Sequence, residues 1–169
     1  MTRPMTFKTP WGWIEIEASV NGITSIDLSP PTRPAASGRQ SVTKDAEIEA
    51  LLAEARTQLL GYFEGTRRKF SLPVDCSAGT PFQRKVWKAI MRIPYGRARS
   101  YQWVATRVGG KQYARAVGMA LGANPVPIVV PCHRIIAHDG SLGGFGCGLP
   151  MKRRLLTLEG ILEQLRHAQ

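Results

Sequence analysis

Apolar and polar residues alternate along two short stretches near the N-terminus, Trp13 to Ala18 and Gly22 to Leu28. A period of two predicts β-strands that bury one face. Asn21-Gly22 between them is a strong turn signal, so the two strands are expected to form a hairpin. A third alternation, over residues 70–74 (Phe70, Leu72 and Val74), predicts one more strand.

The hydrophobic period changes to that of a helix between these strands. Residues 29–44 are rich in Pro, Ser, Thr and Gly and predict a loop, after which Asp45 is expected to cap a helix that ends at Gly65. The apolar stripe of this helix consists of Ile48, Leu51, Leu52, Ala55, Leu59 and Phe63. Residues 1–75 are therefore expected to form a small α/β domain.

Residues 76–169 are expected to form a second, mainly helical domain. Thr80-Pro81-Phe82-Gln83 combines a capping box with proline at the first helical position, which predicts a helix start. This helix is expected to bury Phe82, Val86, Ala89, Ile90 and Ile93.

Two short helices are expected next, followed by one long helix at the end of the chain. The first short helix spans Tyr101 to Val108 and stops at Gly109-Gly110, and the second runs from about Gln112 to Gly122. Two short helices around a tight glycine turn predict a helix-turn-helix. Met151 to Leu165 predicts a single amphipathic helix.

The second helix of this pair is unusually poor in large side chains. Ala or Gly occupies positions 114, 116, 118, 120, 122 and 123, and each interior glycine costs a helix roughly 1 kcal/mol. Close packing against a neighbouring helix is one explanation. The other is close approach to the minor groove of DNA by Ala116 and Gly118, with Arg115 as the one long cation.

Charge is segregated along the chain, whose formal net charge is +11. Residues 1–75 contain nine basic and nine acidic side chains, whereas residues 76–169 contain fourteen basic and three acidic ones. This distribution is typical of a polyanion-binding module beside a supporting one. A solvated cationic surface kept for solubility is the alternative.

The cysteine and histidine patterns narrow the class of protein. The three cysteines include no C-x-x-C pair, and the three histidines form no zinc pattern, so we expect no disulfide framework and no metal. The sequence shows no membrane-spanning run and no signal sequence. A soluble, cytoplasmic protein is expected.

The segment Asn124 to Ile136, NPVPIVVPCHRII, is the strongest candidate for chemistry. Three prolines restrict its backbone to one rigid path. Cys132 precedes His133 and Arg134, and a neighbouring imidazole and guanidinium are expected to lower the pKa of a thiol towards neutrality.

This segment, followed 27 residues after Cys132 by Glu159 in LEG, resembles the active-site signature of the O6-alkylguanine-DNA alkyltransferases. FQRKVWKAIMRIPYGRARSYQWVA and ARAVGMALGANP also match that family in order and spacing, so the resemblance covers about residues 80–161. It implies an α+β fold. A ribonuclease H-like domain would span residues 1–75, and a winged helix-turn-helix-like domain with the cysteine would span 76–169.

The resemblance also implies roles for individual residues. Cys132 accepts the alkyl group and is coupled through a water to His133, which Glu159 orients. An extended segment would point Cys132 and His133 to opposite sides, which is why a water would be needed between them. Tyr101 donates a hydrogen bond to the flipped guanine, and Asn124 supports the cysteine segment.

Further residues are assigned to DNA and to the base pocket. Arg115 matches the arginine that enters the base stack, although a phosphate contact is equally possible. Arg134 is expected either to contact a phosphate or to form an internal ion pair. We assign the pocket that receives the base to Leu121, Pro127, Phe145 and Gly146.

One loop departs from the family pattern. The family commonly has a Tyr-Ser pair where this chain reads Gly143-Gly144-Phe145-Gly146-Cys147, so the hydroxyl groups of that pair are absent and the backbone is more flexible. We expect the reaction to survive, with a wider range of alkyl groups. Cys147 is expected to be a passive neighbour.

The activity implied is irreversible, single-turnover transfer of a methyl or other alkyl group from O6 of guanine, and from O4 of thymine, to Cys132. This reaction needs no cofactor. The expected partner is double-stranded DNA that carries O6-alkylguanine, bound by a monomer without contact to a membrane. The rivals are a non-catalytic alkylated-DNA-binding protein of the same fold, a helix-turn-helix transcription factor and a cysteine hydrolase.

Overall fold

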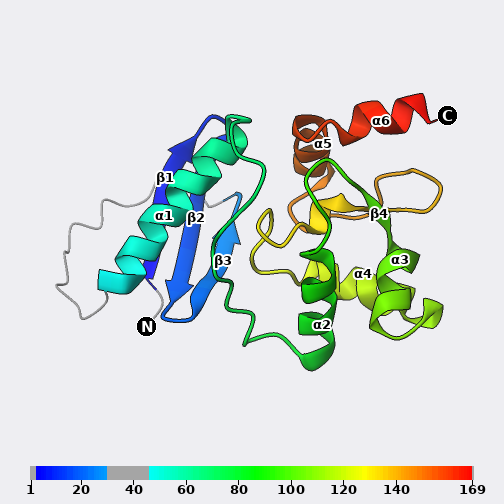
Figure 1. The fold of residues 1–169 in the computed structure, drawn as a ribbon, viewed down its shortest axis with the longest axis horizontal. Helices are drawn as coiled ribbons and strands as arrows, with labels where there is room; N and C mark the ends of the chain where they lie inside the picture. The colour runs from blue at the N-terminus through cyan, green and yellow to red at the C-terminus, as the bar shows by residue number, and fades with distance from the viewer. Residues whose placement is uncertain (1–2, 30–45, 169) are drawn as a thin grey trace. The chain divides into compact units, whose positions relative to one another are not determined.

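The structure is a computed structural model that describes residues 3–29 and 46–168 (Figure 1). The chain divides into two compact units, Met1–Cys76 and Ser77–Gln169. The cap expected at Asp45 and all but Ser29 of the loop expected before it lie outside the described residues. No helix within the described ranges is long and apolar enough to cross a membrane.

The first unit contains an antiparallel sheet of β1 (Arg3–Thr9), β2 (Gly12–Ser19) and β3 (Gly22–Asp27) in that order. The predicted hairpin is confirmed, but Ser19 pairs with Gly22, so its turn is Val20-Asn21 and not Asn21-Gly22. Strand β1 was not predicted, because Phe7 is its one large buried side chain and the alternation is weak. The predicted helix is α1 (Ala46–Phe63), which lies across one face of the sheet (Figure 1).

The strand predicted over residues 70–74 is wrong. Only an isolated parallel bridge joins Ile23 to Val74, with Ile23 N donating to Pro73 O at 2.8 Å. Pro73 has no N–H to donate, so a ladder cannot continue through it. Gly22 is required here, because a Cβ at its φ of +150° would lie 2.6 Å from Pro73 O.

The second unit begins with α2 (Pro81–Ile90), and both bonds of its predicted capping box between Thr80 and Gln83 are present. The predicted helix pair follows as α3 (Tyr101–Val108) and α4 (Ala114–Gly122), joined through a 3-10 turn over Lys111–Tyr113. The buried Trp87 ties α2 to α4, because its indole N–H donates to Ala120 O at 2.8 Å.

The single C-terminal helix predicted over residues 151–165 is wrong. The chain forms α5 (Leu149–Leu158) and α6 (Ile161–His167), separated at Gly160, whose φ of +73° ends the first helix. The break matters for the site because it places Glu159 at the end of α5 instead of within a continuous helix.

The sequence predicted an extended segment around the candidate nucleophile, and this prediction is wrong. Cys132–Arg134 forms one 3-10 turn, followed by β5 (Ile135–Ile136), which pairs in parallel with β4 (Arg99–Ser100). Strand β4 leads directly into α3, so this short sheet connects the cysteine segment to the helix-turn-helix.

Candidate active site

Hydrogen bonds of Asn124 hold the turn that leads to Cys132. Its amide Nδ2 donates to Val130 O at 2.8 Å, and its Oδ1 accepts from Val126 N at 3.0 Å. Within this turn Ile128 is fully buried with a φ of +76°, a strained conformation for a β-branched residue. Such strain persists only where the surroundings determine the backbone, so the path to Cys132 is fixed.

Cys132 lies at the wall of a pocket of about 270 Å³. The residues that line the pocket come from α3, α4, the cysteine turn and the glycine-rich segment before α5: Tyr101, Gly118, Leu121, Gly122, Cys132, Gly144, Phe145 and Gly146. Three of the four predicted pocket residues are among them. The assignment of Pro127 is wrong, because it is buried beside Val130 in the turn and does not line the pocket.

Tyr101 joins the two sides of this pocket. Its hydroxyl accepts a hydrogen bond from Gly144 N at 3.2 Å. Position 143 must be a glycine next to this tyrosine, since a Cβ there would lie 2.6 Å from the Tyr101 hydroxyl. Burial raises the pKa of Tyr101, against the opposite effect of its contact with the Gly144 backbone, so the phenol remains a proton donor.

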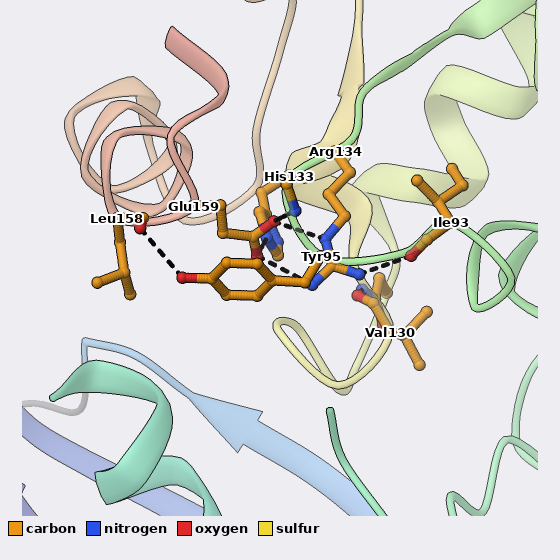
Figure 2. Close-up of polar contacts among 9 residues, drawn as sticks. Ile93, Tyr95, Val130, His133, Arg134, Leu158 and Glu159 are labelled. Carbon is orange, nitrogen blue, oxygen red and sulfur yellow. Dashed lines mark hydrogen bonds and ion pairs between the residues drawn. The ribbon is translucent and has the colours of Figure 1, made fainter. Parts of the chain in front are cut away.

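Beside the pocket, the Glu159 carboxylate accepts hydrogen bonds from several directions (Figure 2). Its Oε1 lies 2.7 Å from His133 Nε2 and 2.9 Å from Arg134 Nη2. Its Oε2 lies 2.9 Å from Arg134 Nε and 3.1 Å from Gly96 N. The three charged or ionisable side chains form a buried cluster that fixes the imidazole ring.

The assignment of Arg134 to DNA is wrong. Arg134 is 6% exposed, and besides Glu159 it donates through Nη1 to Ile93 O at 2.6 Å (Figure 2). Its guanidinium also lies 5.9 Å from the ring centroid of Tyr95, whose hydroxyl donates to Leu158 O. Of the two roles left open by the sequence, the structure shows the internal ion pair.

The cluster sets the protonation states of its members. Burial alone would raise the pKa of Glu159, but the hydrogen bonds from His133 and Arg134 and the positive charge of Arg134 bring that pKa down to about 2. Burial lowers the pKa of His133, against the opposite effect of Glu159. Glu159 is therefore ionised and His133 neutral at pH 7. Because a carboxylate only accepts hydrogen bonds, Nε2 of His133 carries the ring proton and Nδ1 carries the lone pair.

The expected lowering of the pKa of Cys132 is wrong for the protein without DNA. Burial raises this pKa to about 11, although Asn124 and Lys152 act in the opposite direction. The neighbours in sequence do not supply positive charge to the sulfur, because His133 is neutral and Arg134 is paired with Glu159. Cys132 is therefore a neutral thiol at pH 7.

The low pKa of Glu159 predicts a pH-dependent contribution to stability. A carboxylate with a depressed folded-state pKa stabilises the fold above its unfolded pKa of about 4.3, and this contribution is lost as pH falls towards the folded value. We expect the difference in the free energy of unfolding between wild type and Glu159→Gln to narrow from pH 4.3 to about pH 2. Urea unfolding at a series of pH values measures it, and a constant difference would contradict the assignment.

Two family models and a known relative match this chain. Residues 81–161 match the family model of the 6-O-methylguanine DNA methyltransferase DNA-binding domain, and residues 3–76 match that of its ribonuclease-like domain. The constitutive methylated-DNA–protein-cysteine methyltransferase of Bacillus subtilis (strain 168) is 42% identical over 158 residues, which cover 92% of this chain and 94% of the relative. The chain belongs to the 6-O-methylguanine DNA methyltransferase family.

Solved structures of the family share the fold. The Mycobacterium tuberculosis O6-methylguanine methyltransferase superposes with a TM-score of 0.77 at 38% identity, over 94% of this chain and 93% of that one. The Mycobacterium tuberculosis OGT in complex with DNA gives a TM-score of 0.76 at 39% identity, over 91% and 90% of the two chains. The predicted family and α+β fold are thus confirmed.

The glycines of α4 are not explained by packing within the chain. A Cβ at Gly118 would meet Tyr101 Cε1 at 3.9 Å, and one at Gly122 would meet nothing within 4 Å beyond the helix's own backbone. Of the two explanations left open by the sequence, the structure favours the approach of an external molecule. Arg115 is exposed on this helix and Ala116 is half-buried.

Several residues of the site had no recognisable signal in the sequence. Gly96 meets Glu159 through its backbone N–H, and Lys152 is fully buried near Cys132, yet neither belongs to a periodic or catalytic pattern. Gly122 and Gly144 line the pocket without side chains. Among the described residues, no three His, Cys, Asp or Glu side chains gather so that they could hold a metal ion.

Proposed function

We propose that this protein repairs double-stranded DNA by transferring a methyl or other alkyl group from O6 of guanine to Cys132. The observation that carries the proposal is the placement of the Cys132 thiol in the wall of a pocket, next to a histidine that a buried carboxylate orients. A pocket of about 270 Å³ with Phe145 and Leu121 in its lining suits a base turned out of the duplex.

The chemistry is a displacement at carbon. The bond between Cys132 Sγ and the alkyl carbon forms while the bond between that carbon and guanine O6 breaks. The thiol proton passes through a water to His133 Nδ1, and Glu159 stabilises the imidazolium. The electron pair of the broken bond stays on the guanine, which takes up one proton from solvent, and the imidazolium later returns one proton to solvent. Tyr101, at the pocket wall, donates towards the purine as negative charge develops.

The product explains why the protein acts once. Cys132 becomes a thioether, and no group at the pocket offers a route to hydrolyse a carbon–sulfur bond. The same displacement would act on O4-alkylthymine. We propose a monomer that acts on chromosomal DNA in the cytoplasm, without a cofactor.

Binding to DNA follows from charge and from shape. The second unit carries the net positive charge of the chain, and α4 presents small residues around Gly118 with Arg115 exposed beside them. Such a helix can press against the minor groove, and Arg115 can fill the gap that the flipped base leaves. Because minor-groove readout is degenerate, we expect little preference for sequence.

Stoichiometry tests this proposal. Duplex DNA with one O6-methylguanine is incubated with a tenfold excess of lesion over protein, and restored guanine is counted after digestion to nucleosides. We expect one guanine restored per molecule of active protein and no further turnover. Continued turnover or no restoration would contradict the proposal.

Two substitutions of Gly118 on α4 are expected to act differently, one on stability and the other on activity. Gly118→Ala should raise the free energy of unfolding by about 1 kcal/mol, because alanine favours a helix and the new methyl group meets no clash. Gly118→Leu should lower methyl transfer from duplex DNA by on the order of tenfold or more, because its side chain holds the helix away from the groove or fills the pocket. Denaturant unfolding and single-turnover kinetics measure the two effects.

A matched control separates helix propensity from contact with DNA. Thr57→Ala on the exposed face of α1 raises helix propensity within the first unit and should leave transfer unchanged. Wild-type transfer by Gly118→Leu would mean that this face of α4 does not approach DNA.

A further inference from the structure

Lys152 is a buried cation for which the proposed reaction gives no role. It lies in α5 with 0% exposure, and a charged group so deeply buried is rare unless it is paired. Its contacts are backbone carbonyls: Nζ donates to Ile135 O at 2.6 Å and to Gly144 O at 3.0 Å. Both of these partners are neutral, so the burial of the ammonium charge is costly, and a function that offsets this cost is expected.

One carbonyl belongs to the backbone that follows the nucleophile, and the other belongs to the wall of the pocket. Ile135 directly follows the turn Cys132–Arg134, and Gly144 lines the pocket. One ammonium group therefore connects the backbone beside the sulfur to the segment that faces it.

The facing segment needs such a connection. Residues 143–148 contain four glycines, and Gly143 and Gly148 have positive φ, so ordering this segment costs more backbone entropy than ordering one without glycine. Apart from Lys152, Gly144 is held by the Tyr101 hydroxyl, at 3.2 Å from its N–H and 3.5 Å from its carbonyl oxygen. Both side chains therefore hold Gly144, which lines the pocket.

We propose that Lys152 is a positioning residue for alkyl transfer, whose ammonium group ties the glycine-rich wall of the pocket to the backbone that carries Cys132. The inference rests on the proposed function of Cys132. Charge-assisted hydrogen bonds to two carbonyls fix the wall more firmly than neutral donors would, and the wall in turn sets the space that an alkylated base enters.

The positive charge of Lys152 also favours the reaction, because it stabilises the thiolate of Cys132. Cys132, Cys147 and Tyr101 are the titratable groups of the pocket and its wall, and none of them is cationic. Lys152 lowers the pKa of Cys132, whereas Cys147 raises it. Burial lowers the pKa of Lys152 itself to about 8, so most of the group is still charged at pH 7.

Lys152→Met tests the inference because methionine has a similar length but cannot donate. We expect the transfer rate at saturating methylated duplex to fall by on the order of tenfold or more, while affinity for unmodified duplex stays within about twofold. Amide hydrogen exchange of residues 143–148, measured without DNA, should be faster than in wild type. Arg153→Met, which removes the exposed cation next in sequence, should change neither the exchange nor the saturating rate.

The outcomes separate this inference from the proposed function. If wild type transfers the methyl group and Lys152→Met matches it in rate and in exchange, the inference is overturned. If wild type transfers nothing, the proposed function fails, and the exchange of residues 143–148 still decides whether Lys152 orders the wall. Should Lys152→Met not fold, Lys152→Gln replaces it, since its shorter neutral side chain cannot span both carbonyls, and wild-type behaviour of that variant overturns the inference.

Discussion

Cys132→Ala should transfer no measurable methyl group from O6-methylguanine, a loss of at least about four orders of magnitude in rate, because the acceptor atom of the reaction is gone. Binding of methylated duplex should remain, since the basic surface and the pocket are unchanged apart from one sulfur atom. Single-turnover assays of restored guanine and a gel-shift titration measure the two properties.

Two control variants test whether the loss is specific to Cys132. Cys147→Ala removes the other thiol near the pocket and should transfer at close to the wild-type rate, as should Cys76→Ala in the first unit. Transfer by Cys132→Ala would assign the acceptor elsewhere. A wild-type protein that binds the lesion without removing it would instead favour the non-catalytic alkylated-DNA-binding protein.

Glu159→Gln should damage stability and activity together. The substitution leaves the Arg134 guanidinium buried without its carboxylate, and breaking a buried pair in this way costs about 3–5 kcal/mol in the free energy of unfolding. It also removes the negative charge that stabilises the His133 imidazolium, so transfer by the remaining folded protein should fall by about 10²–10⁴-fold. Denaturant unfolding and single-turnover kinetics at a temperature where the variant is folded measure these effects.

The exposed Glu163 on α6 provides the matched control. Glu163→Gln makes the same chemical change two residues after α6 begins, and it should alter unfolding by no more than about 0.5 kcal/mol and transfer hardly at all. If Glu159→Gln behaved like this control, the buried cluster of His133, Arg134 and Glu159 would have no role in the reaction.

The sequence predicted those parts of the fold that depend on local signals. Capping at Thr80, the hairpin of β2 and β3 and the two helices around Gly109-Gly110 all follow from patterns within a few residues. The strand expected at residues 70–74 and the single C-terminal helix failed because one residue in each case outweighs the apolar pattern. Pro73 cannot join a ladder, and Gly160 adopts a left-handed conformation.

At the candidate site, too, the sequence predicted only what depends on spacing along the chain. Family spacing was enough to name Cys132, His133 and Glu159, and the structure brings the last two to 2.7 Å. Spacing could not show that Arg134 turns inwards, because this depends on a carboxylate 25 residues away. Nor could it show that burial outweighs neighbouring charge at Cys132, or that a lysine on α5 reaches two carbonyls beside the pocket.

Peptide mass spectrometry after reaction with methylated duplex tests the central claim most directly. The protein is incubated with duplex DNA that contains O6-methylguanine with an isotopically labelled methyl group, then digested and sequenced by fragmentation. The account predicts the labelled methyl group on the sulfur of Cys132, in amounts equal to the guanine restored. Label on any other residue, or restored guanine without label on Cys132, would contradict it.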